Sequence, residues 1–326
     1  MATTQRLIAQ LLEETGATDP DAAIRSKAQD ALHRYRAVFD HMTLPVNAEA
    51  IASFLGIGFS TDAPLVSQDA ELVPTGNGTV AIRINPDRPE TRKRFSVAHE
   101  ISHTFFPNYH MKTWCRADHR YRSRDDLDGL IETLCDVGAA ELIMPTAVFA
   151  PAAATIDTAE RLVGLAQMFG VSREAAMRRY AETHARGVAA VFFTWKLKPT
   201  QRATARSELQ PQLEGMDPVR SERLRVSYSI RSAQFENLGI FIPPDKSIQD
   251  DGPIYDAAST GLPQQGICNL DLGRAGGLYG VLAIPVWTPS AELGPKGEQS
   301  VAAIVEPIKL QAPRRKVSEP SRRLLD

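Results

Sequence analysis

The stretch RFSVAHEISH, residues 94–103, decides the fold of the region around it. Val97, Ile101 and Phe105 recur every four residues, and this spacing predicts one apolar stripe along a helix. Two histidines form a second stripe about half a turn away, because each residue of a helix advances by about 100°. Pro107 ends the helix. The pattern therefore predicts a helix that packs on a core and lines a cleft with its histidines.

The polar stripe of this helix has the residues of a metal centre. His99 and His103 lie about one turn apart, so both imidazoles can bind one metal ion from the same side. Glu100, next to the first histidine, can take a proton from an attacking water as a general base. A catalytic zinc needs three protein ligands and keeps one position open, so a third ligand must come from another segment.

The next predicted helix, residues 130–142, supplies carboxylates at helical spacing. Glu132 and Asp136 are four residues apart and share one face. We expect Glu132 to be the third ligand of a His₂Glu site, and Asp136 to accept a hydrogen bond from a ligand histidine. The alternative is that both carboxylates are solvated charges on a helix surface. Glu141 is a rival third ligand, but helical phase places it about 180° from Glu132.

Zinc is the expected metal, and Mn²⁺ or Fe²⁺ also bind histidine and carboxylate ligands. The metal would polarise the scissile carbonyl and lower the pKa of a water. A further side chain must stabilise the oxyanion. Four candidates lie between the two helices, and the sequence does not choose among them: Tyr109, His110, His119 and Tyr121.

The composition is that of a globular protein. The 326 residues are enough for two domains or three small ones, with 43% hydrophobic and 23% charged residues. A formal net charge of −2 gives no reason to expect a polyanion or an anionic membrane as the main partner. Cys115, Cys135 and Cys268 are too scattered for a disulfide framework, and Cys135 is interpreted as a packing residue. With no signal peptide or membrane span evident, a cytoplasmic location is expected.

The chain as a whole predicts an α+β protein. Helices are expected at 20–41 and 47–55, strands at 65–73 and 79–84, and two helices within 158–183. From residue 187 short β-rich runs dominate, at 188–195, 224–230, 239–242, 277–287 and 301–305. We therefore predict a peptidase domain at 1–150, a helix-turn-helix segment at 151–186, a mainly β domain at 187–310 and a disordered basic tail at 311–326.

The segment 160–180 has the pattern of a helix-turn-helix. Ser172 is a good N-cap for its second helix. Arg173, Arg178 and Arg179 could contact DNA phosphates. The alternative is that the helix pair packs on the peptidase core and docks a protein partner. Net acidity, and the absence of Asn or Gln on the second helix for base readout, favour docking over DNA binding.

RFSVAHEISH together with IETLCDVGAAELIMP, residues 131–145, resembles the ImmA/IrrE family of metallopeptidases. The layout looks like the radiation-response IrrE branch, in which a peptidase domain precedes a helix-turn-helix segment and a GAF-like domain. The resemblance implies a zincin-like fold, metal binding by His99, His103 and Glu132, and catalysis by Glu100. Asp136 stands where the family commonly has asparagine.

The resemblance also implies a substrate. Members of the family cleave a transcriptional repressor, usually a helix-turn-helix protein, and so induce stress or mobile-element genes. A GAF-like domain at 187–310 would be a sensor, although no residue identifies its ligand. A different class remains open, in which the protein is a DNA-binding or sensory regulator with a structural metal. A structural zinc normally has a fourth protein ligand, and none is evident in the sequence.

Overall fold

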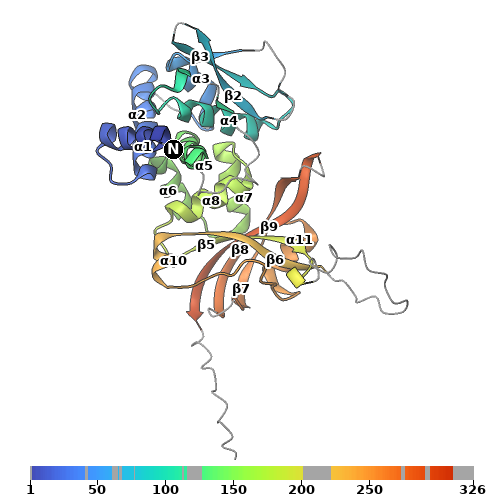
Figure 1. Cartoon of the computed structure of the whole chain (residues 1–326). Coiled ribbons are helices and arrows are strands. Elements are labelled where there is room, and N and C mark those ends of the chain that lie inside the picture. The colour runs from blue at the N-terminus through green and yellow to red at the C-terminus, as the bar shows by residue number, and fades with distance from the viewer. Residues whose placement is uncertain are drawn as a thin grey trace, which may run out of the picture. The chain divides into compact units, whose positions relative to one another are not determined.

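The computed structural model describes residues 2–40, 43–60, 65, 68–76, 78–111, 114–115, 127–200, 222–272, 276–290 and 294–310. This part of the chain is α+β, with helices and two sheets (Figure 1). It divides into an N-terminal unit, Met1–Ile156 with Arg161–Thr183, and a C-terminal unit, Asp157–Glu160 with His184–Asp326. The predicted basic tail lies outside the described residues.

Three helices open the N-terminal unit: α1 (Ala2–Thr15), α2 (Pro20–Phe39) and α3 (Ala48–Phe54). The Asp19 carboxylate caps α2 by accepting hydrogen bonds from two backbone N–H groups, and Pro20 occupies its first position. The predicted helices at 20–41 and 47–55 are confirmed, whereas α1 was not predicted. Ala23, Ile24 and Ala28 form part of the buried face of α2.

A small sheet follows, with strand order β1-β3-β2-β4. Its strands are β1 (Gly58–Phe59), β2 (Ala70–Gly76), β3 (Thr79–Ile84) and β4 (Trp114–Cys115). The strand β1 pairs with β3 in parallel, β2 pairs with β3 and with β4 in antiparallel fashion, and β2 and β3 form a hairpin. Gly76 and Gly78, between the two strands, have φ values of 90° and 75°, which glycine adopts without strain. The preceding strand begins at residue 70 rather than at 65.

Two helices then cross at close range. The helix α4 (Glu90–His103) carries RFSVAHEISH and packs against β2, β3 and α5 (Leu127–Ile143). Gly138 of α5 allows the close approach, because a Cβ there would lie 2.6 Å from Oγ of Ser102. Val97 and Ile101 are buried, as the apolar stripe predicted. The close crossing brings the face of α5 that carries Glu132 against the histidines of α4.

Helices α6 (Thr146–Ala154), α7 (Ala159–Phe169) and α8 (Arg173–Thr183) complete the helical part. Ser172 accepts a hydrogen bond from the backbone N–H of Ala175, so the predicted N-cap is confirmed. The turn between α7 and α8 is held from α4, because the Arg94 guanidinium donates to the carbonyl of Gly170. Pro45 also lies against Gly170, which has a φ of 59°. The helix pair is therefore fixed to the helix that carries the histidines.

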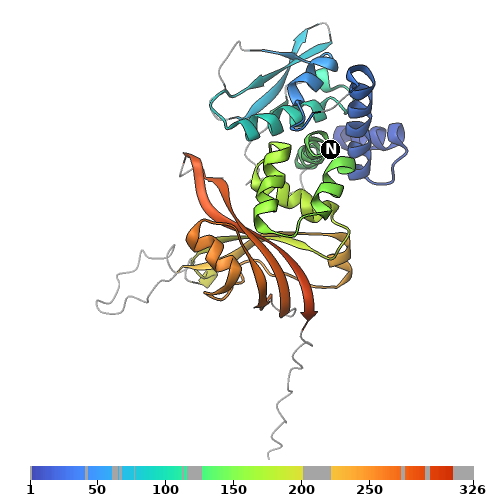
Figure 2. The same cartoon turned by 180° about the vertical axis from the view of Figure 1, so that it is seen from behind.

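The C-terminal unit is a five-stranded antiparallel sheet in the order β6-β5-β9-β8-β7 (Figure 2). One face packs on α10 (Ala233–Asn237) and α11 (Gly252–Thr260) through a core that includes Phe193, Phe235 and Ile254. The strands are β5 (Ala189–Lys196), β6 (Arg223–Arg231), β7 (Gln264–Leu270), β8 (Gly277–Ser290) and β9 (Gly294–Leu310).

Four of the five predicted β-rich runs of this unit fall in strands, and the run at 239–242 does not. Ile240 and Ile242 are instead buried core residues of an irregular segment between α10 and α11. Gly239 has a φ of 64°, outside the range of a strand, which breaks the extended backbone there. The strand β7 and the helices α10 and α11 were not predicted.

Among the described residues, no single helix is both long and apolar enough to cross a membrane. The pair Gly129–Ile143 and Thr146–Ala154 meets the requirement only when taken together, and it is bent by 70°.

Candidate metal centre

The two histidines of α4 are fully buried and face one carboxylate. His99 and His103 are both 0% exposed. The Nε2 atom of His99 lies 3.1 Å from Oε2 of Glu132, and the Nε2 atom of His103 lies 3.6 Å from Oε1 of the same side chain. The predicted residues His99, His103 and Glu132 are therefore brought together, from two helices that cross at Gly138.

The distances from Glu132 to the two histidines fit a zinc ion. With metal–ligand bonds of about 2.0–2.1 Å in a tetrahedral site, neighbouring ligand atoms lie about 3.3 Å apart. The two distances from Glu132 to the histidines, 3.1 and 3.6 Å, bracket this spacing. Two imidazole nitrogens and one carboxylate are also a common ligand set of catalytic zinc. The residues present therefore suit a divalent metal with one open position.

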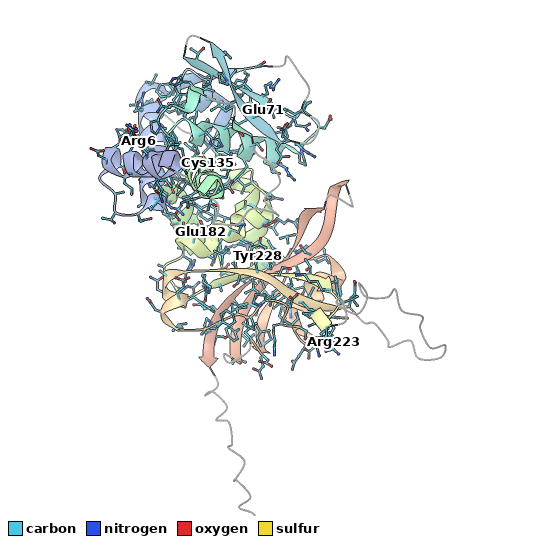
Figure 3. The ribbon with its side chains drawn as sticks, viewed as in Figure 1. Arg6, Glu71, Cys135, Glu182, Arg223 and Tyr228 are labelled. Atoms are coloured by element: carbon cyan, nitrogen blue, oxygen red, sulfur yellow. The ribbon has the colours of Figure 1, made fainter. Side chains whose placement is uncertain are left out.

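The second nitrogen of each histidine has a different partner, and both partners lie on α5. Nδ1 of His99 is 2.8 Å from Oδ1 of Asp136, as the sequence predicted. Nδ1 of His103 is 3.3 Å from Sγ of Cys135. Figure 3 places Cys135 within the N-terminal unit. This contact was not predicted from the sequence, although Cys135 follows Glu132 by three residues and so shares its side of the helix.

Cys135 also provides an alternative ligand set. Ligand atoms of His99, His103 and Cys135 all lie within 4.8 Å of one another. The contact of Cys135, however, is with Nδ1 of His103, whereas Glu132 contacts Nε2 of both histidines. An ion bound to the two Nε2 atoms would meet Glu132 rather than the thiol. The geometry thus favours the set of two histidines and Glu132.

Glu100 completes the group of buried polar residues on α4. Glu100 is 0% exposed and directly follows His99 in the helix. Its negative charge is one of the influences that raise the pKa of His99. A carboxylate held without water around it, next to a metal ligand, is suited to accept a proton during a reaction.

The pKa of His99 shows how strongly the neighbouring carboxylates act. Burial lowers this pKa, but hydrogen bonds with Asp136 and Glu132 outweigh burial and raise it from 6.5 to about 9. Without a metal, a proton shared between the imidazole and these carboxylates is therefore stable at neutral pH. A metal ion that binds Nε2 of His99 must displace that proton.

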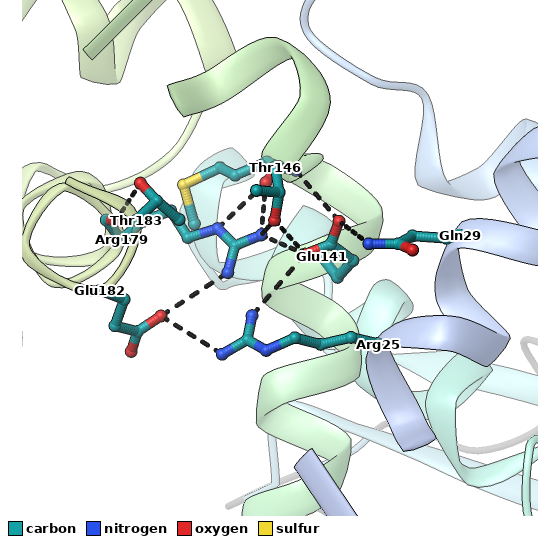
Figure 4. A network of polar contacts seen from close by, with 8 residues as sticks. Arg25, Gln29, Glu141, Thr146, Arg179, Glu182 and Thr183 are labelled. Carbon is teal, nitrogen blue, oxygen red and sulfur yellow. Dashed lines mark hydrogen bonds and ion pairs between the residues drawn. The ribbon is translucent and has the colours of Figure 1, made fainter. Parts of the chain in front are cut away.

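Glu141, the rival third ligand, lies in a separate network. Its side chain is 1% exposed and pairs with the equally buried guanidinium of Arg179 on α8 (Figure 4). It also accepts hydrogen bonds from Gln29 and from the backbone N–H and hydroxyl of Thr146. These contacts lower the pKa of Glu141 against the effect of burial. Its carboxylate binds α8 to α5 and does not face the histidines.

The same network changes the interpretation of the helix pair. Arg179, one of three arginines considered for phosphate contacts, is 1% exposed and donates to the carbonyl of Met144. A guanidinium buried in this way cannot reach a DNA backbone. Arg178 is exposed, but it is a single charge beside a partly buried Arg173. The structure therefore favours a helix pair that packs on the peptidase elements.

Two of the four candidates for oxyanion stabilisation lie in the described part of the chain. Tyr109 and His110 lie in the short 3₁₀ helix η1 (Tyr109–Met111) after α4, and their rings pack edge to face with centroids 5.5 Å apart. Both are partly buried. His119 and Tyr121 lie outside the described residues.

One comparison with known proteins covers the residues of this site. Residues 58–180 match the model of a peptidase family described as IrrE N-terminal-like domain. The matched segment contains both histidines, Glu132, Asp136 and most of α8. A solved structure entitled "Mycobacterium tuberculosis transcriptional regulator" superposes with a TM-score of 0.48 at 12% identity, covering 94% of each chain. The curated proteins contain no match.

Proposed function

We propose that this chain, whose residues 58–180 match the family described as IrrE N-terminal-like domain, is a metal-dependent endopeptidase of the ImmA/IrrE type with a His₂Glu site. One observation carries the proposal. A single carboxylate, Glu132, lies within 3.1 and 3.6 Å of Nε2 atoms of two buried histidines one helical turn apart. Three protein ligands from the described residues would leave the fourth position of a tetrahedral metal for water and substrate, as in catalytic zinc sites.

Each side chain has a role in this proposal. His99, His103 and Glu132 hold the metal, with zinc the preferred ion and Mn²⁺ or Fe²⁺ as alternatives. Glu100 is the general base. Asp136 accepts the Nδ1–H of His99, which leaves the lone pair of Nε2 for the metal and fixes the orientation of the ring.

The chemistry follows from these positions. A bound divalent metal would polarise the scissile carbonyl and acidify a water. Glu100 takes the proton of the attacking water and then gives it to the departing amine. Its burial keeps bulk water away from this proton. Nε2 of His99 and Nε2 of His103 must carry no proton when they bind the metal. The 2.8 Å contact between Nδ1 of His99 and Oδ1 of Asp136 holds the required tautomer of His99.

We propose a helix-turn-helix transcriptional repressor as the substrate, whose cleavage would induce a stress or mobile-element response. The basis is the resemblance of the two motifs to the ImmA/IrrE family. The packing of α7 and α8 against α4 and α5 supports a role of the helix pair in docking a protein rather than DNA. The C-terminal unit would serve as the GAF-like sensor, and the expected location is the cytoplasm.

The proposal is tested first by metal content. Purified full-length protein should hold about one zinc ion per chain, and His103→Ala should lose it. The protein is then co-expressed with candidate helix-turn-helix repressors, and repressor fragments are detected by immunoblotting. Cleavage should require Glu100 and should stop when a chelator is added.

The matched control is Glu160→Gln, which makes the same change at an exposed glutamate of α7. Glu100→Gln should retain metal and lose cleavage, whereas Glu160→Gln should retain both. Cleavage that persists in the Glu100→Gln variant would contradict the assigned mechanism. An absence of metal from the wild-type protein after zinc loading would contradict the metal centre itself.

A further inference from the structure

We propose that Cys135 is a positioning residue of the metal centre, which accepts a hydrogen bond from Nδ1 of His103 and so orients this ligand. The inference rests on the proposed function, because it assigns a role toward the metal that the site would hold. It adds a thiol to the histidines and carboxylates of the centre.

The geometry pairs each histidine with its own partner on α5. Nε2 of both rings faces Glu132, and the Nδ1 atoms face Asp136 and Cys135 at 2.8 and 3.3 Å. Glu132, Cys135 and Asp136 occupy positions i, i+3 and i+4, which share one side of a helix. One side of α5 therefore provides a contact for all four nitrogens of two imidazoles.

The direction of the hydrogen bond follows from ligation. When Nε2 of His103 gives its lone pair to a metal, the ring proton is on Nδ1, so this nitrogen is a donor. The sulfur atom of Cys135 then acts as the acceptor, at a distance normal for a sulfur contact. Cys135 and His103 are both 0% exposed, so bulk solvent does not reach this contact.

The hydrogen bonds that Asp136 and Cys135 accept from the two histidines should differ in strength. A carboxylate is a strong acceptor and raises the basicity of its histidine, whereas sulfur is a weak acceptor. His99 is therefore the more basic ligand, and His103 is held mainly in orientation. Loss of such a contact at a metal-ligating histidine typically reduces metal affinity by about 10–100-fold. We expect about 10-fold for Cys135, at the low end of this range.

Three substitutions separate the hydrogen bond from the packing of the thiol. Cys135→Val fills the space without an acceptor, Cys135→Ala leaves a small cavity without an acceptor, and Cys135→Ser keeps an acceptor. Cys268→Ala is the control for loss of a partly buried thiol in the C-terminal unit. Affinity for Co²⁺ and Zn²⁺ is measured on the full chain by competition with a chromophoric chelator.

The wild-type protein and Cys268→Ala should bind equally, Cys135→Val and Cys135→Ala should bind about 10-fold more weakly, and Cys135→Ser should recover most of the loss. Equal affinity of wild type and Cys135→Val would overturn the inference while leaving the proposed function intact. Failure of the wild-type protein to bind either metal would instead overturn the proposed function.

Two spectra test the role directly. In the zinc-loaded protein, the Nδ1–H resonance of His103 should shift in Cys135→Val, and that of His99 should not. In the Co²⁺-loaded wild type, no intense near-ultraviolet band of a thiolate bound to cobalt should appear, because Cys135 contacts the ring and not the metal. Such a band would overturn the inference, because Cys135 would then be a ligand.

Discussion

Arg179 of α8 and Glu141 of α5 form an ion pair in which each side chain is only 1% exposed. The guanidinium also donates to the carbonyl of Met144, at the end of α5, and to the hydroxyl of Thr146. Arg25 adds a second positive charge near Glu141, at 3.6 Å. The partners come from segments far apart in the sequence, so the pair ties α8 to the helix that carries Glu132.

Removing one partner of this pair should strongly destabilise the N-terminal unit. Arg179→Met leaves the Glu141 carboxylate buried without its main counter-charge, and such losses cost about 3–5 kcal/mol. The exposed neighbour provides the control, since Arg178→Met should change stability by less than about 0.5 kcal/mol. Urea unfolding measures both variants. Equal stability of the two would show that the ion pair contributes nothing to the fold.

Gly138→Ala should disturb the metal centre through the backbone. The added methyl group would lie 2.6 Å from Oγ and 3.0 Å from Cβ of Ser102, so α4 and α5 must move apart. Overpacking of this kind costs about 1–3 kcal/mol, and it should also weaken zinc binding. Gly164→Ala, where no atom lies within 4 Å of the new Cβ, is the control and should bind zinc normally. Zinc affinity unchanged in Gly138→Ala would contradict this packing argument.

The metal-free protein should lose stability as the pH rises. The folded-state pKa of His99 is about 9 against an ordinary 6.5, so its protonated form stabilises the folded state. This contribution is complete below pH 6.5 and is lost as the pH approaches 9, with a slope of up to about 1.4 kcal/mol per pH unit. Denaturant unfolding of chelator-treated protein measures the slope. His99→Gln should remove it, and a wild-type stability that stays constant over this range would contradict the raised pKa.

The affinity for zinc should rise with pH, whereas the stability of the metal-free protein falls, because the ion must displace the proton of His99. Affinity should therefore rise with pH until about 9, and binding at neutral pH should release a proton. Calorimetric titrations in buffers of different ionisation enthalpy count the released protons. Binding without proton release at neutral pH would show that His99 is already neutral in the metal-free state.

Asp136→Ala should weaken zinc binding by about 10–100-fold, since it removes the acceptor at Nδ1 of His99. Asp136→Asn keeps an acceptor oxygen at this position and should lose less. Competition with a chelator distinguishes the two variants. If both bound as tightly as the wild type, the 2.8 Å contact would not orient the ligand.

Much of the candidate site could be predicted from the sequence because helical periodicity relates neighbouring residues directly. The spacing of His99 and His103 on one helix, and of Glu132 and Asp136 on another, is sufficient to indicate shared faces. The choice of Glu132 over Glu141 rested on the same periodicity, and the burial of Glu141 against Arg179 agrees with it.

Contacts between distant segments were not predictable in this way. The role of Arg179 depends on where α8 packs, and its charge alone indicated an exposed residue. Cys135 was interpreted as a packing residue because the rotation of α5 against α4 was unknown. The run at 239–242 has the hydrophobicity of a strand, yet its residues fill a core in an irregular segment because the left-handed backbone of Gly239 breaks the extension.

The position of the α7–α8 pair has a consequence for genetics. Arg94 connects its turn to the helix of His99 and His103, and Arg179 connects its second helix to the helix of Glu132. A random-mutagenesis screen for inactive protein should therefore return substitutions at Gly170 and Arg179 beside those at the metal ligands. Taken at face value, such alleles would suggest a defect in recognising DNA or a partner, although their primary lesion would be a distorted metal centre.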